Sequence, residues 1–124
     1  MKDEGGKQVR DLRLRTKDFA LRIIRRYQAL LKGEGVAQVL GRQLLRSGTS
    51  IAADYREACR GKSNADFITK LEGALQELDE TDLWLELLGD AGTIKSSRVQ
   101  PLRTEVDELI AIFVTMIPKL KGRR

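Results

Sequence analysis

The chain has 124 residues, enough for one domain with a buried core, and 41% hydrophobic with 33% charged residues is typical of a folded protein. It contains no histidine and one cysteine, Cys59, which excludes a Ser-His-Asp triad, a histidine-based zinc site and an internal disulfide. The sequence contains no run of about 18 apolar residues, the length that a membrane-spanning helix needs. Residues 1–15 lack the apolar centre of a signal peptide. We therefore expect a cytoplasmic protein without a cofactor or metal.

Four segments have the hydrophobic periodicity of helices, and glycine-containing breaks separate them. Few aromatic residues and two prolines also favour an all-α protein. Residues 1–15 are polar and predict a mobile arm or strap, and residues 121–124 predict a basic tail. The predicted helices cover, approximately, residues 16–32, 36–60, 64–88 and 98–120.

The connections between the predicted helices are short, about three to eight residues. Short connections force consecutive helices to lie antiparallel beside each other. The economical arrangement of residues 16–120 is therefore an antiparallel up-down-up-down four-helix bundle.

Charges are unevenly distributed along the chain. Residues 1–33 contain ten basic and four acidic residues, whereas residues 63–92 contain one basic and eight acidic residues. Residues 93–124 are again basic, with seven basic and three acidic residues. This asymmetry favours either basic surfaces for a polyanion or contacts between acidic and basic helices.

Basic side chains gather on the outer face of the first predicted helix and at the C-terminal end. With a sequence pI of about 9.6, they are candidates for contacts to nucleic-acid phosphates. A charged outer face is also typical of plain solvated surface, and no aromatic residues alternate with these basic ones to stack bases. The candidate contacts are Arg22, Arg25, Arg26, Lys32, Lys119, Lys121, Arg123 and Arg124.

The third predicted helix has more apolar surface than one core requires, because residues 83–88 are apolar almost all round. Either residues 89–97 or the N-terminal arm covers this surface, or it is a subunit interface centred on Trp84. Small residues on a second face of the second helix would allow another helix to approach. The candidate oligomer interface comprises Leu45, Thr49, Ala52, Arg56, Trp84, Leu87 and Leu88.

Polar residues at helical spacing on the second and third helices predict a structural network. Asp54 lies at the margin of the core stripe, where an acid needs a basic partner or hydrogen bonds; a ligand or catalytic role is the alternative. Acidic residues surround much of the third helix, which favours a solvated face over a metal site. The predicted network comprises Arg46, Asp54, Glu77 and Glu80.

Two motifs on consecutive predicted helices resemble a known family. Residues 43–58 read QLLRSGTSIAADYREA, and residues 66–71 and 77–88 read DFITKL and ELDETDLWLELL. They are similar to the signatures of the bacterial four-helix-bundle proteins known as the 23S ribosomal RNA intervening-sequence protein family. The chain departs from the family pattern at residues 52–54, where Ala-Ala-Asp replaces a frequent Gly-Ala-Asn.

The resemblance implies four-helix bundles that assemble into homopentameric rings and have no established enzymatic reaction. Some members of the family are encoded inside insertions in ribosomal RNA genes. Related proteins are accessory factors of the reverse transcriptases of diversity-generating retroelements, where a basic pentamer is thought to bind nucleic acid and the polymerase.

We therefore expect a non-enzymatic homopentameric scaffold that binds structured RNA, DNA or an RNA–protein complex, with a reverse transcriptase as a candidate partner. Five copies would multiply individually weak phosphate contacts. The alternative is a protein–protein interaction scaffold that binds no nucleic acid.

Overall fold

The computed structural model describes residues 2–122, with side chains from residue 6 onward. This part of the chain is helical apart from three short connections and a turn at residues 121–122. Arg123 and Arg124, two of the candidate phosphate contacts, lie outside the described residues. The predicted bounds of the second, third and fourth helices agree with the observed ones to within two residues. The four helices are α1 (Lys2–Leu30), α2 (Val36–Cys59), α3 (Asn64–Asp90) and α4 (Ser96–Leu120).

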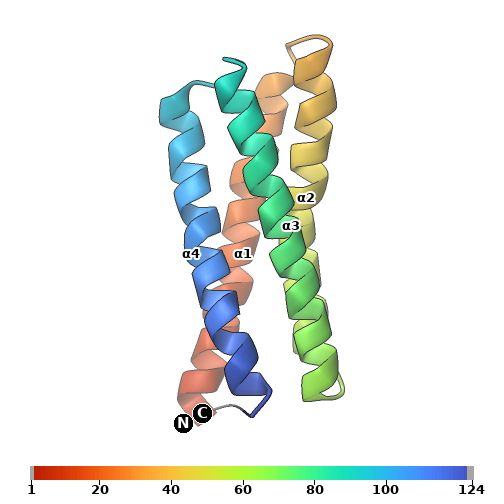
Figure 1. The fold of residues 1–124 in the computed structure, drawn as a ribbon, viewed down its shortest axis with the longest axis vertical. Helices are drawn as coiled ribbons and strands as arrows, with labels where there is room; N and C mark the ends of the chain where they lie inside the picture. Colours follow the sequence, from red (N-terminus) through yellow and green to blue (C-terminus); the bar gives the residue numbers. More distant parts are fainter. Residues whose placement is uncertain (1, 123–124) are drawn as a thin grey trace.

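Consecutive helices run in opposite directions, so the chain forms an up-down-up-down bundle with both termini at the same end (Figure 1). The α1–α2 and α3–α4 connections lie together at the other end, which we call the upper end. Helix α2 packs closely on both α1 and α3, and α3 on α4, whereas the α1 and α4 backbones approach each other at few positions. The α1–α4 seam is therefore the loosest of the four.

The core consists of residues spaced alternately three and four apart along each helix. In α3 this stripe contains Leu71, Ala74, Leu78, Thr81, Leu85 and Leu88, all fully buried. Such a repeat of 3.5 residues is the pattern of helices that wrap gently around one another. At the lower end, the Tyr55 ring of α2 stacks on Phe113 of α4, with centroids 5.7 Å apart.

The prediction of a polar arm over residues 1–15 is wrong, because residues 2–15 form the first half of α1. Leu12 and Thr16 continue the buried stripe of this helix and are 2% and 0% exposed. The Thr16 hydroxyl donates a hydrogen bond to the Leu12 carbonyl, 2.7 Å away, so this polar group is satisfied within the helix. Long-range packing of two residues thus stabilises a segment whose composition is mostly polar.

Glycines allow α1 to lie unusually close to α2. A Cβ atom at Gly48 would lie 2.9 Å from both Cγ1 and Cγ2 of Ile23, and one at Gly41 would lie 3.2 Å from Leu30 and 3.3 Å from Tyr27. Ile23 is fully buried against this bare stretch of α2 backbone. The absence of a side chain at residue 48 therefore allows the short distance between α1 and α2.

Polar contacts fix the register of α3 against its neighbours. The Ser47 and Thr81 hydroxyls, both fully buried, are hydrogen-bonded to each other across α2 and α3 at 2.9 Å. On the other side, Arg103 of α4 binds the Asp82 carboxylate of α3 through two hydrogen bonds of 2.9 and 3.1 Å. The Ser63 side chain caps α3 by accepting a hydrogen bond from the Asp66 backbone N–H.

We expect Gly48→Ala to lower the free energy of unfolding by about 1 kcal/mol or more, because overpacking against Ile23 costs about 1–3 kcal/mol. The intrinsic gain from replacing glycine in a helix is only about 0.5–1 kcal/mol. Gly73→Ala is the matched control, since its Cβ would lie at an ordinary 3.5 Å from the Asp54 carboxylate, and it should stabilise the protein. Urea unfolding of both variants tests the pair, and equal stabilisation would contradict the close approach.

Candidate nucleic-acid interface

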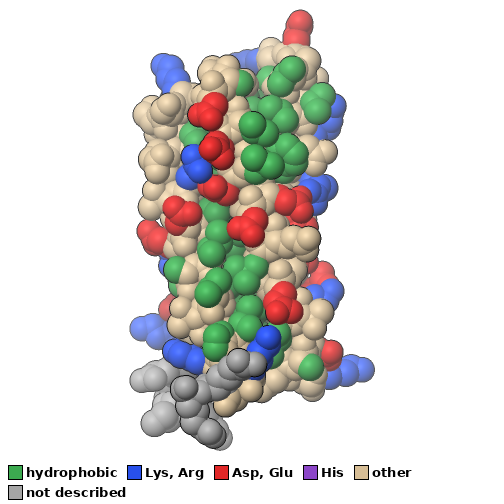
Figure 2. Space-filling model, viewed as in Figure 1, with side chains coloured by type: hydrophobic (Ala, Val, Ile, Leu, Met, Phe, Trp, Pro, Cys, Tyr) green, Lys and Arg blue, Asp and Glu red, His purple; other side chains and the backbone are tan. Residues whose placement is uncertain are grey.

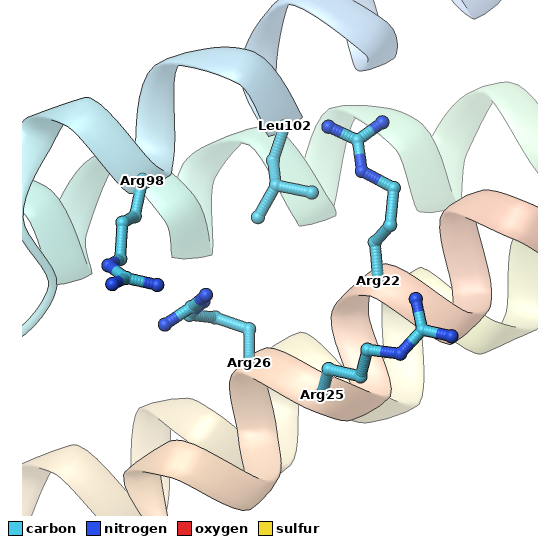
Figure 3. Close-up of a pocket in the computed structure, with 5 residues that line it drawn as sticks. All are labelled: Arg22, Arg25, Arg26, Arg98 and Leu102. Atoms are coloured by element: carbon cyan, nitrogen blue, oxygen red, sulfur yellow. The ribbon is translucent and has the colours of Figure 1, made fainter.

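Four arginines meet at the upper part of the α1–α4 seam. Arg22, Arg25 and Arg26 come from three nearby positions of α1, and Arg98 comes from the first turn of α4. Together with Leu102 they line a cavity of about 200 Å³. Figure 3 shows Arg26 and Arg98 pointing toward each other, with Leu102 between the helices and Arg22 extending toward α4, whereas Arg25 points away from Arg98.

No described carboxylate lies within ion-pair distance of these four guanidinium groups. A guanidinium remains protonated at any physiological pH, so the pocket carries several uncompensated positive charges. Each guanidinium also presents donors in a planar fork that matches the oxygens of a phosphate. This arrangement is suited to binding an anion rather than a cation or an apolar ligand.

The middle of the same seam is closed by Arg15 of α1. Its guanidinium binds the Glu105 carboxylate of α4 through hydrogen bonds of 2.7 and 2.8 Å and also pairs with Glu108. Hydrogen bonds to Glu105, and then to Glu108, raise the pKa of Arg15, against an opposing effect of burial. The ion pair separates the arginine pocket from the lower end of the seam and fastens α1 to α4 there.

The predicted basic residues fall into separate groups rather than one surface. Lys32 is exposed at the upper end, just beyond α1. Lys119 lines the lower end of the α1–α4 seam beside Gln8, Thr115 and Met116. Lys121 lies 3.9 Å from the Glu72 carboxylate, so part of its charge is compensated within the chain.

Arg98 is a site residue that sequence reasoning missed. It lies beside the first-helix arginines only because α4 runs antiparallel to α1 in this register. A helical wheel of a single segment contains no such information. The basic character of residues 93–124 is the signal that could have directed attention to it.

The predicted polar network is present in part. Arg46 of α2 pairs with Glu80 at 2.6 Å and with Glu77 at 3.4 Å, both on α3. Asp54 stands apart, with no ion pair or hydrogen bond to another described residue. Its neighbour Lys70 instead pairs with Glu57 at 2.7 Å. Of the four predicted network residues, Arg46, Glu77 and Glu80 join α2 to α3, and Asp54 takes no part.

The predicted interface residues differ in how far they are buried within their own chain. Leu88 is fully buried in the core of its own chain, so its assignment to a subunit interface is wrong. Trp84 is half-buried and packs against the same core, whereas Leu87 is 39% exposed and Arg56 is exposed. The remaining predicted residues are half-buried: Leu45, Thr49 and Ala52.

Exposed apolar side chains outside the predicted interface set extend this surface at the upper end. Leu83 is 45% exposed, and Val36 and Val39 at the start of α2 are 65% and 52% exposed. The Arg46–Glu80 pair sets a register in which Val39 is level with Leu87. We call Val36, Val39, Leu83 and Leu87 the upper apolar patch; Figure 2 shows hydrophobic side chains gathered over this part of the bundle. These four side chains remain 39–65% exposed, so neither residues 89–97 nor residues 6–15 cover the patch.

Across residues 2–122, acidic residues and the cysteine nowhere gather in threes in a way that could hold a metal ion. None of the four helices combines the length and apolarity that a membrane crossing needs.

The fold and its seam define a small all-α bundle protein with an arginine-lined cleft. Residues 11–115 match the family model described as 23S rRNA-intervening sequence protein. Because the match covers most of the chain, the protein belongs to the 23S rRNA-intervening sequence protein family. The resemblance read from the motifs of α2 and α3 is thereby confirmed.

The chain is also similar to a solved structure from Bacteroides thetaiotaomicron VPI-5482, a protein of unknown function from the S23 ribosomal protein family. The two chains are 37% identical and superpose with a TM-score of 0.79, over 85% of this chain and 96% of the other. No curated protein matches the chain.

We expect Asp54→Asn to stabilise the protein at pH 7. Burial raises the pKa of the Asp54 carboxyl, the Glu57 charge raises it further, and Lys70 opposes the rise. Because the folded state holds this proton more tightly than the unfolded state, ionisation of Asp54 disfavours folding above the folded-state pKa. The disadvantage disappears as the pH falls below the unfolded pKa of about 3.9.

The expected gain for Asp54→Asn is about 0.5 kcal/mol at pH 7, because water screens a half-exposed carboxylate, and it should vanish below about pH 4. Asp79→Asn, at an exposed position of α3, is the control and should show no such pH-dependent difference. Thermal unfolding of the three proteins at pH 7 and pH 3.5 measures it. A gain that is equal at both pH values would refute the electrostatic explanation.

Proposed function

We propose that the protein is a non-enzymatic, cytoplasmic, homo-oligomeric scaffold that binds nucleic acid through the phosphate backbone. The observation that carries this proposal is the α1–α4 pocket, which four arginines line without a carboxylate partner among the described residues. Structured RNA, alone or within an RNA–protein complex, is the ligand that the family membership favours. A reverse transcriptase is a candidate protein partner on the same family grounds.

Phosphate contact without base readout fits the side chains that the pocket offers. Arginines in this pocket present donors, whereas its one apolar residue, Leu102, is buried and cannot stack a base. Binding through phosphates alone is weak for one subunit and is strengthened when several copies act on one strand. Assembly is therefore part of the proposed mechanism.

Two separated surfaces favour a cyclic assembly. The upper apolar patch lies on the α3 side of α2. A helix turns by about 100° per residue, so Leu45 and Ala52 point about 120–140° away from Val39 around the axis of α2. When one subunit's patch contacts a different surface of the next subunit, the interface is head-to-tail and can close into a ring. The family resemblance, rather than this geometry, suggests five subunits.

A protein–protein scaffold without nucleic acid is the second candidate. The upper apolar patch favours it, since large exposed apolar side chains of this kind mark protein contacts. Its partner would bind at the upper end of the bundle, and the basic residues would only keep the surface hydrated.

We expect the double variant Arg26→Gln/Arg98→Gln to bind a structured RNA several-fold more weakly than the unmodified protein. The plot of log K against log salt concentration should become less steep, its negative slope shrinking by about 0.9 for each lost duplex phosphate contact. Arg42→Gln, at an exposed position of α2 outside the pocket, is the control and should change neither value. Fluorescence anisotropy at several salt concentrations measures both. Absence of salt-dependent RNA binding would favour the protein scaffold.

We expect Leu87→Glu to dissociate the oligomer, because it places a charge within the upper apolar patch while leaving the core intact. This variant is cleaner than Trp84→Ala, since Trp84 packs against the core of its own chain. Native mass spectrometry gives the subunit number, and circular dichroism checks that the helices persist. A monomeric unmodified protein, or an unchanged mass for Leu87→Glu, would exclude this patch as the interface.

A further inference from the structure

Within the described part of the bundle, the arginine pocket brings like charges together without an ion-pair partner. Arg46 is compensated by Glu77 and Glu80 at the α2–α3 seam, and Arg103 by Asp82 at the α3–α4 seam. Lower on the α1–α4 seam itself, Glu105 and Glu108 compensate Arg15. Above Arg15, the described chain supplies no anion to Arg22, Arg26 or Arg98.

Two of these arginines are held toward the seam rather than spread into water. Arg22 and Arg26 are half-buried, and Arg26 points across the seam at Arg98 (Figure 3). The floor beneath them is Leu102, which is 5% exposed. Positive charges near apolar atoms repel each other more strongly than in open water, so the arginines themselves work against contact of α1 with α4.

A phosphate group fits the volume of this pocket and complements its positive charge. The cavity of about 200 Å³ is large enough for one such group with part of its hydration. Forked guanidinium donors from two helices could then bind different oxygens of the same phosphate. A terminal phosphate, with a charge near −2, offsets more of the arginine charge than the single charge of an internal phosphodiester.

We propose that this pocket is a phosphate-binding site in which one phosphate group bridges α1 and α4 and fastens the upper part of their seam. The proposal rests on the proposed function only for the source of that phosphate, which is a nucleic-acid strand. A free phosphate compound would supply the same chemistry. Arg25, which points away from Arg98, belongs to the rim and contributes less than Arg26 (Figure 3).

The first experiment compares the thermal unfolding of the unmodified protein in chloride, phosphate and pyrophosphate at equal ionic strength and pH. We expect phosphate, and pyrophosphate more strongly, to raise the unfolding temperature by several degrees relative to chloride, because a ligand of the folded state stabilises it. Equal unfolding temperatures in the three salts would overturn the proposal.

The variant Arg26→Gln/Arg98→Gln should affect the unfolding temperature differently in chloride and in pyrophosphate. In chloride it should unfold at the same or a higher temperature than the unmodified protein, because repulsion is removed. In pyrophosphate it should lose the rise. Arg42→Gln makes a charge change of the same kind at one site and should retain the rise. A rise that persists in the double variant would overturn the proposal, since the anion would then bind elsewhere.

A second experiment distinguishes the sources of the phosphate. Oligoribonucleotides of one sequence, with a 5′-phosphate or a 5′-hydroxyl, are titrated onto the unmodified and double-variant proteins. Several-fold tighter binding of the phosphorylated strand, lost in the double variant, assigns the pocket to a strand end. Equal binding of both strands, weakened alike in the double variant, assigns it to internal phosphates and still supports the site.

The two proposals can fail separately. If pyrophosphate stabilises the protein through these arginines but no RNA binds, the phosphate site stands and the nucleic-acid function fails. If RNA binds with the same affinity to the double variant and pyrophosphate has no effect, the site fails and nucleic acid must bind elsewhere.

Discussion

The contact of Ile23 with the bare backbone at Gly48 determines how close α1 lies to α2, and thereby how far it lies from α4. A Cβ atom at that position would lie 2.9 Å from Ile23, so the observed approach of α1 to α2 requires glycine. Helix α1 is thereby drawn toward α2, while α4 packs on α3. The α1–α4 seam is left as the widest, and Arg15 spans it with a side chain long enough to reach Glu105. The arginine pocket exists because the seam above that ion pair is not filled.

Charge compensation explains why the acidic third helix and the basic first helix belong to one protein. Helix α3 is neutralised in part by its neighbours, through Arg46 from α2 and Arg103 from α4. Figure 2 shows acidic side chains along the face of the bundle around α3 and α4, with basic side chains mainly at its margins. Among the described residues, the basic side chains at the upper end of α1 have no such acidic partner on a neighbouring helix. Individual exposed ion pairs contribute little to stability, so their arrangement matters mainly for where charge is left over.

Periodicity predicted most of the fold, and the residues that it misplaced have identifiable causes. Leu88 falls far from Leu71 on a wheel of 3.6 residues per turn, but the helices follow a 3.5-residue repeat that returns it to the core. The first half of α1 was missed because its stability depends on Leu12 and Arg15 meeting other helices, not on local composition. For the candidate site, the arginines of α1 were predicted from one helix, whereas Arg98 required the register between two helices. Pairing of Arg46 with Glu80 could be anticipated because complementary charges faced each other on adjacent segments.

The length of the α1–α4 seam sets a spacing between its two basic ends. Arg98 and Lys119 are 21 residues apart on α4, which corresponds to about 31 Å along the helix axis. One turn of a B-form DNA duplex is of similar length, about 34 Å. A duplex lying along this seam would present the same backbone to the arginines at one end and to Lys119 at the other, with a groove facing the Arg15–Glu105 pair between them.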